Sequence, residues 1–337
     1  MATSFRKLLA YGPAVMVSVL LTFMVGSVLP PLVGLGVFVA GLVVMVALLS
    51  ELRNSASVTT LLSAATLVFT LMVACVKAAT VTVPVGEVMF ARSFLGLVPV
   101  LTYLALRGEL RHAFKTERLG GHFLRSSVGV SSMALWFTCL ALIPLPEALA
   151  IGYASPLVTV VFAALFLGET VRVYRWSAVA GGFFGILIIL GPRFSPETLA
   201  GAGTRETMGA LTALASAFTA AGAMVLIRRL ITTESTPSIV VYFSLIASGF
   251  ALLTLPWGWV WPDAWQATLL VLSGLLGGVG QILMTESYRH ADASTIATFD
   301  YSGMIWGLLV GYLLFGETAE PIVLIGMAIV IAAGLFI

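Results

Sequence analysis

The chain carries one five-residue motif twice, as Phe166-Leu167-Gly168-Glu169-Thr170 and as Leu314-Phe315-Gly316-Glu317-Thr318, at an offset of 148 residues. Each copy follows one long apolar run and precedes another. At the same offset Tyr153 aligns with Tyr301, and Leu135 aligns with Leu283. The repetition predicts two halves of similar fold, residues 58–192 and 206–337.

Composition places both halves in a membrane. Of the 337 residues, 60% are hydrophobic and 9% are charged, and the mean hydropathy is +1.08. An ordinary soluble domain carries about 25% charged residues, so these few charges cannot cover a soluble fold. The same numbers exclude a disordered chain, a coiled coil and a disulfide scaffold. Cys75 and Cys139 lie in apolar segments and give no disulfide framework or metal motif.

Apolar runs between polar breaks predict twelve membrane-spanning helices, because a span needs about 20 residues and the runs lack the alternation of a barrel strand. The predicted spans are 14–29, 33–50, 58–81, 84–106, 126–143, 147–167, 174–191, 207–227, 238–256, 265–287, 294–315 and 321–337. The expected fold is an all-α polytopic membrane protein: a ten-helix core of two five-helix halves, preceded by an apolar two-helix hairpin in residues 1–57. A signal peptide is the competing interpretation of the first run, because Arg6 and Lys7 precede it.

Five spans per half is an odd number, so the second half must enter the membrane from the opposite side. Glu169 is then expected inside and Glu317 outside. Inverted repeats are the architecture of secondary transporters, whose halves rock about a site near the midplane to give alternating access.

Basic residues in short loops mark the cytoplasmic side of a membrane protein. With a cytoplasmic N-terminus, thirteen basic residues fall inside and only Arg193 and Arg205 fall outside. The thirteen are Arg6, Lys7, Arg53, Arg107, Arg111, Lys115, Arg118, Arg125, Arg172, Arg175, Arg228, Arg229 and Arg289. We therefore expect an inner-membrane protein with both termini in the cytoplasm.

These features together resemble the EamA-type transporters of the drug/metabolite transporter superfamily. The resemblance rests on the five-plus-five spans, the Gly-Glu after the fourth span of each half, the segment 84–93 (PVGEVMFARS) and the stretch 293–317. It implies secondary active or facilitative transport of a small organic metabolite, through a cavity between the first, third and fourth core spans of both halves. The substrate stays open between a riboflavin- or S-adenosylmethionine-type importer and an amino-acid or drug exporter.

Charges inside spans are costly and are functional candidates by default. Lys77 and Glu87 flank a short outer turn, where they could form an ion pair or snorkel to the interface. Arg92 lies deeper and requires a substrate carboxylate or phosphate, an acid on a facing helix, or backbone carbonyls. Asp300 could bind a cationic group, take up a proton or pair with a basic residue. Glu286 lies near an inner helix end.

Aromatic residues away from the membrane interfaces form a second group of candidates for substrate binding. Trp136, Tyr153, Tyr301 and Trp306 could stack on a flat metabolite, or could simply pack the interior. Pro156 interrupts the hydrogen bonding of the fourth core span and could leave carbonyls facing a cavity.

The competing class is an intramembrane enzyme acting on lipids. Such an enzyme needs clustered carboxylates or His–acid pairs, but His112, His122 and His290 lie in or beside loops. We expect no enzymatic activity, no catalytic residue, no metal, no cofactor and no nucleic-acid partner. The expected partners are a small-molecule substrate, the lipid bilayer and, as an open alternative, protons, with a monomer as the functional unit.

Overall fold

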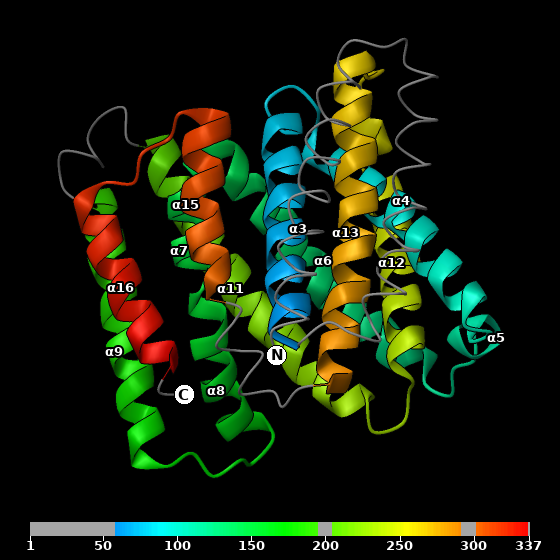
Figure 1. Cartoon of the computed structure of the whole chain (residues 1–337), viewed down its shortest axis with the longest axis horizontal. Helices are drawn as coiled ribbons and strands as arrows, with labels where there is room; N and C mark the ends of the chain where they lie inside the picture. Colours follow the sequence, from blue (N-terminus) through cyan, green and yellow to red (C-terminus); the bar gives the residue numbers. More distant parts are fainter. Residues whose placement is uncertain (1–57, 195–203, 291–300, 336–337) are drawn as a thin grey trace, which may run out of the picture.

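The computed structural model describes residues 58–194, 204–290 and 301–335, and every regular element in these ranges is a helix (Figure 1). The first range holds α3 (Val58–Ala79), α4 (Val85–Leu106), α5 (Leu110–Ala113), α6 (Leu119–Leu142), α7 (Leu145–Gly152), α8 (Ala154–Phe166), α9 (Val173–Leu190) and the 3-10 turn η1 (Gly191–Phe194). The others hold α11 (Thr204–Leu230), α12 (Thr236–Leu252), η2 (Leu255–Trp257), α13 (Ala264–His290), α15 (Ser302–Phe315) and α16 (Pro321–Leu335).

Ten apolar helical segments correspond to the ten predicted core spans. Six are long and apolar enough to cross a membrane, with α7 and α8 counted together, and four are shorter. The prediction of an all-helical polytopic chain is therefore confirmed. The predicted spans 14–29 and 33–50 lie outside the described residues, so the N-terminal hairpin stays a prediction.

The predicted start of the third core span, at residue 126, is wrong. Helix α6 begins seven residues earlier, at Leu119, and includes His122 and Arg125. The sequence interpretation placed the start of the span directly after Arg125, because a charge was taken to bound the apolar run. Both side chains lie against the second half: His122 is buried beside Glu234, and the Arg125 guanidinium lies over the Phe243 ring.

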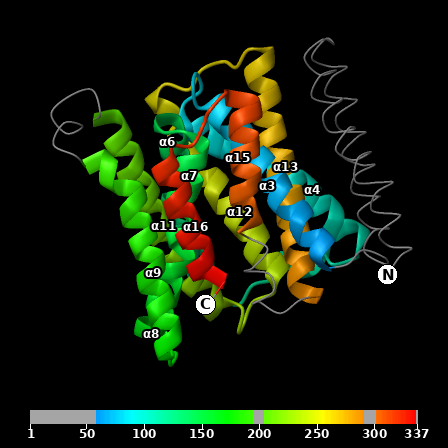
Figure 2. The same cartoon turned by 60° about the vertical axis from the view of Figure 1, so that its left-hand side comes forward.

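Helices of the two halves pack mainly against each other. Helix α11 lies against α6, α8 and α7, and in the reciprocal arrangement α3 lies against α13 and α15. Helix α16 pairs with α9, and α4 packs on α13 and α12. Both views show α3 beside α13 and α16 beside α9 (Figures 1 and 2). In Figure 1, α3 rises from the lower to the upper edge while α11 descends.

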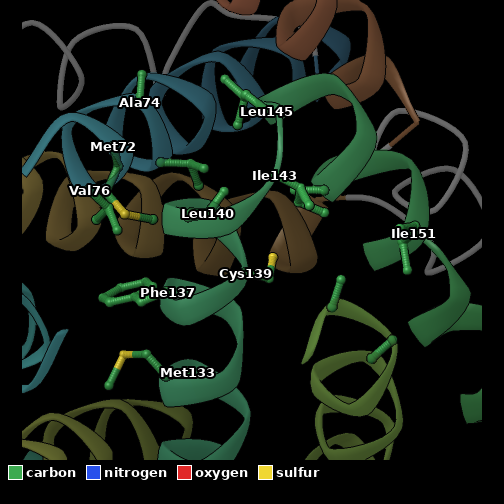
Figure 3. Packing of buried hydrophobic residues seen from close by; sticks show 14 of the residues in the cluster. Met72, Ala74, Val76, Met133, Phe137, Cys139, Leu140, Ile143, Leu145 and Ile151 are labelled. Carbon is green, nitrogen blue, oxygen red and sulfur yellow. The ribbon is translucent and has the colours of Figure 1, made fainter. Parts of the chain in front are cut away.

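The apolar core joins α3, α6 and α7 to the second half. Met72 and Val76 on α3 face Phe137 and Leu140 on α6, with Leu145 at the start of α7 (Figure 3). The same cluster continues into α11, α13, α15 and α16. Lipid cannot supply a hydrophobic driving force between helices, so close packing of this kind must hold the bundle together.

Small residues allow the closest helix crossings. A Cβ at Gly278 would stand 2.4 Å from the carbonyl oxygen of Gly96, so α13 and α4 touch through their backbones. A Cβ at Gly185 would stand 2.9 Å from the carbonyl oxygen of Gly326, which joins α9 to α16. Gly181, one turn before Gly185, has no such neighbour within 4 Å.

Candidate functional site

The two Gly-Glu motifs fold into the same turn. Gly168 and Gly316 adopt left-handed φ angles of 67° and 65° after α8 and α15. The following amides donate to carbonyls six residues back, from Glu169 to Ala163 at 3.3 Å and from Glu317 to Gly311 at 3.0 Å. A residue in the left-handed conformation commonly ends a helix, and glycine is favoured there. The sequence repeat is therefore also a repeat of local structure.

Glu317 reaches back to the first half. Its Oε1 lies 3.0 Å from Lys77 Nζ, and its Oε2 accepts a 2.7 Å hydrogen bond from the Leu145 amide. Lys77 Nζ also donates to the Leu140 and Ile143 carbonyls at the end of α6. The cation thus lies at a helix C-terminus and the carboxylate at a helix N-terminus, as the backbone dipoles favour. We call this part of the molecule the Lys77 end; it is uppermost in Figure 1.

Of the two alternatives for Lys77 and Glu87, the ion pair between them does not form, because Lys77 pairs with Glu317 instead. Buried Glu87 accepts a 3.1 Å hydrogen bond from the amide of Val260, in the loop between α12 and α13. Glu87 therefore fixes a loop of the second half onto α4.

The other Gly-Glu motif makes a matching pair at the opposite end of the bundle, here called the Arg228 end. Glu169 Oε1 lies 2.8 Å from Nη1 of Arg228, in the last turn of α11. Arg229 donates to the carbonyl of Phe166, the last residue of α8. Unlike the Lys77–Glu317 pair, this pair is about half exposed.

Glu234 is the counterpart of Glu87 at the Arg228 end. Its Oε1 accepts hydrogen bonds from the amides of Glu117 and Arg118 and from the hydroxyl of Thr116, in the loop before α6. His122 Nε2 lies 3.3 Å from its Oε2. Burial alone would raise the pKa of Glu234, but these donors together hold the pKa below its ordinary value. Glu234 is therefore a charged anchor between the two halves.

Tyr153 and Tyr301 stack on each other, with ring centroids 5.2 Å apart. These are the two tyrosines that align at the 148-residue offset. Tyr153 separates α7 from α8, and Tyr301 immediately precedes α15. The fourth core span is interrupted at Tyr153, three residues before Pro156, and carbonyls that face a cavity at Pro156 stay a prediction. Pro156 follows in the first turn of α8 and is exposed.

Arg92 and Arg125 lie inside helices α4 and α6, and both are half-buried. Arg125 was assigned by sequence to a cytoplasmic loop, and that assignment is wrong. Its Cζ lies 4.0 Å from the centroid of the Phe243 ring on α12. Helices α4 and α6, which carry the two arginines, pack on each other, and both pack on α12. The structure thus brings together one residue that the sequence singled out and one that it missed.

The two tryptophans come from different halves, Trp136 from α6 and Trp306 from α15. Trp136 on α6 packs against Gly152 at the end of α7, where an added Cβ would stand 2.9 Å from its ring. The indole nitrogen of Trp306 on α15 is buried without a hydrogen-bond partner. Asp300 lies outside the described residues, and so does the side chain of Glu286.

A further charged cluster closes the Lys77 end. Arg193 makes a two-point contact with buried Glu147, at 2.8 Å for each oxygen, and also contacts Glu206. Within the described residues no three His, Cys, Asp or Glu side chains group closely enough to hold a metal ion.

The sequence matches the EamA-like transporter family over residues 56–191 and again over 207–337, and the chain belongs to this family. It is similar to a riboflavin transporter of Vibrio cholerae (29% identity, covering 75% of this chain and 83% of the relative). It is also similar to the pseudopaline exporter CntI of Pseudomonas aeruginosa (30% identity, 80% and 91%). An S-adenosylmethionine uptake transporter of Rickettsia bellii is 26% identical over 74% of this chain and 82% of its own length.

A solved crystal structure with 20% sequence identity superposes with a TM-score of 0.61, covering 83% of this chain and 96% of the other. At that identity the likeness shows the fold alone. The predicted resemblance to EamA-type transporters is confirmed by the two family matches.

Proposed function

We propose that this protein is a secondary transporter, active or facilitative, that moves a small organic metabolite across the inner membrane by alternating access. The two halves, 58–192 and 206–337, are inverted relative to each other. Three reciprocal contacts support this: the Gly-Glu ion pairs at opposite ends, the Glu87 and Glu234 anchors, and the Tyr153–Tyr301 stack. Each contact joins one half to the other, and the 148-residue offset relates the two Gly-Glu glutamates and the two stacked tyrosines.

The ion pairs supply two gates in this proposal. The Lys77–Glu317 gate is outer and the Glu169–Arg228 gate is inner. Opening one end separates its pair while the other stays formed, and water can hydrate the exposed charges. The family relatives include an uptake transporter and an exporter by name, and both directions are compatible with this mechanism.

Flux into proteoliposomes across a panel of vitamins, nucleosides, amino acids and metallophores tests the proposal. Arg92→Ala and Asp300→Asn are expected to reduce flux while leaving the amount of folded protein unchanged, and Arg111→Gln, on the exposed α5, serves as the matched control. If Asp300 couples protons, its Asn variant should lose the pH dependence of flux. Absence of flux for every solute by folded wild-type protein would refute transport.

A further inference from the structure

Two arginines enter the interior of the bundle from opposite ends. Arg92 lies about 10 Å along α4 from its first residue, and Arg125 lies about 9 Å along α6, at 1.5 Å per residue. Helix α4 starts at the Lys77 end and α6 starts at the Arg228 end. The two helices nevertheless pack on each other, and Phe243 of α12, which packs on both, covers the Arg125 guanidinium. The pair therefore concentrates positive charge between the two ends.

Neither arginine forms an ion pair with any residue of the described part of the chain. Nε and Nη1 of Arg125 are buried without a hydrogen-bond partner, and the Phe243 ring covers one face of its guanidinium. The hydroxyls of Ser93 and Ser126, the next residue on each helix, are also buried and unpaired. Buried cations and donors without acceptors are costly in a protein interior. A ligand that supplies the acceptors would remove this cost.

A glycine lies beside each guanidinium. A Cβ at Gly277 on α13 would stand 3.4 Å from Arg92 Nε. A Cβ at Gly129 on α6 would stand 3.6 Å from Arg125 Nη1 and 3.0 Å from the Phe243 ring. Side chains at either position would press on the arginines, so the glycines leave room for the two planar groups.

We propose that Arg92 and Arg125 together bind an oxyanion group of the transported molecule, which makes the substrate an anionic metabolite bearing carboxylates or a phosphate. Each planar guanidinium can bind such a group through two parallel hydrogen bonds. Two guanidiniums from different helices suit two carboxylates or one phosphate better than a single carboxylate. This inference rests on the proposed transport function and names the substrate class for it.

Ligand-free protein gives the first test, which requires no knowledge of the substrate. Because neither cation has an ion-pair partner in the described part of the chain, Arg92→Gln and Arg125→Gln should each raise or leave unchanged the melting temperature of purified protein. A clear drop in both variants and in Asp300→Asn would mean that the arginines serve a carboxylate of the chain itself. That result would overturn the proposal.

Binding gives the second test, with citrate as the carboxylate probe, glycerol phosphate as the phosphate probe and sodium chloride at matched ionic strength as the control. We expect a ligand-specific rise of about 3 °C in wild-type protein at saturation. The dissociation constant should increase at least about 30-fold in Arg92→Gln and Arg125→Gln, and stay unchanged in Arg111→Gln. The more effective probe identifies the anion. No shift with either probe, or equal shifts in all variants, would refute the site.

The two proposals can fail separately. Anion binding without flux of any solute would contradict transport and leave the arginine site standing. Flux of a neutral solute that is insensitive to both arginine substitutions would support transport and refute the arginine site.

Discussion

Lys77 shows how one buried charge can be satisfied from three directions. It contacts the Glu317 carboxylate and two carbonyls at the end of α6, and its Nζ lies 5.6 Å from the centroid of the Phe315 ring. Removing one partner of a buried pair leaves the other charge uncompensated, which costs more than the pair itself contributes. The equivalent pair at the Arg228 end is half exposed and solvated.

We predict that Lys77→Met destabilises the protein by about 3–5 kcal/mol, whereas Arg228→Gln costs at most about 1 kcal/mol. Thermal unfolding in detergent should show a large and a small shift in the melting temperature. Adding Glu317→Gln to Lys77→Met should recover part of the loss, because it removes the stranded charge and keeps an acceptor for the Leu145 amide. Equal losses at both ends would contradict the difference in burial.

At the scale of single residues, the sequence identified most of the charges within the spans but not the residues that they contact. Lys77, Glu87 and Arg92 could be selected because charges within apolar runs are conspicuous. The pairing of Lys77 with a residue 240 positions later depends on how α15 lies against the first half, which no local pattern specifies. Sequence reasoning missed Arg125 because it took this charge as the boundary of a span. The mostly apolar residues on both sides of Arg125, from Leu119 onwards, could have indicated one continuous helix.

At the scale of elements, the two Gly-Glu turns end α8 and α15 in the same way. Both glycines have open space around them, since an added Cβ would meet no atom within 4 Å. The requirement for glycine therefore comes from the positive φ angle and not from crowding.

Gly168→Ala and Gly316→Ala should each destabilise the protein by about 1–2 kcal/mol, the cost of a left-handed conformation for a residue with a Cβ. Asparagine should be tolerated better at both positions. Gly181→Ala is the control, because Gly181 has equally open space in the middle of helix α9 and alanine favours a helix by about 0.5–1 kcal/mol. The melting temperature should therefore fall in the first two variants and rise or stay constant in the third.

At the scale of the whole molecule, the excess of basic residues in the loops of one side predicts that the Arg228 end of the bundle faces the cytoplasm. Arg111 and Trp261 are both exposed and lie at opposite ends. The native Cys75 and Cys139 are buried, so they should not react with added reagents.

A membrane-impermeant maleimide applied to intact spheroplasts should label Trp261→Cys but not Arg111→Cys. Lysis should expose Arg111→Cys to the reagent, and the wild-type chain should stay unlabelled throughout. Labelling of Arg111→Cys in sealed cells would show that the orientation in the membrane is opposite to the proposed one. The fold itself would not be called into question.

Ten core helices could be predicted because each needs only a long apolar run, and the family resemblance could be predicted because the motifs repeat. The reciprocal packing of α3 on α13 and α11 on α6 could not be read from the sequence, since nearly all faces of these helices are apolar and membrane segments lack the polar faces that reveal orientation. The interruption before α8 was indicated by Pro156 but not placed at Tyr153, and the contact of Tyr153 with Tyr301 is a tertiary property that the alignment of the two tyrosines does not reveal.

The Tyr153–Tyr301 stack has a mechanical consequence. When two residues related by a repeat touch each other, their contact lies on the axis that exchanges the halves. If the halves exchange conformations between the two transport states, this contact is mapped onto itself. The ring separation of 5.2 Å should therefore be the same in both transport states. The Lys77–Glu317 and Glu169–Arg228 distances should change in opposite directions, one increasing when the other decreases.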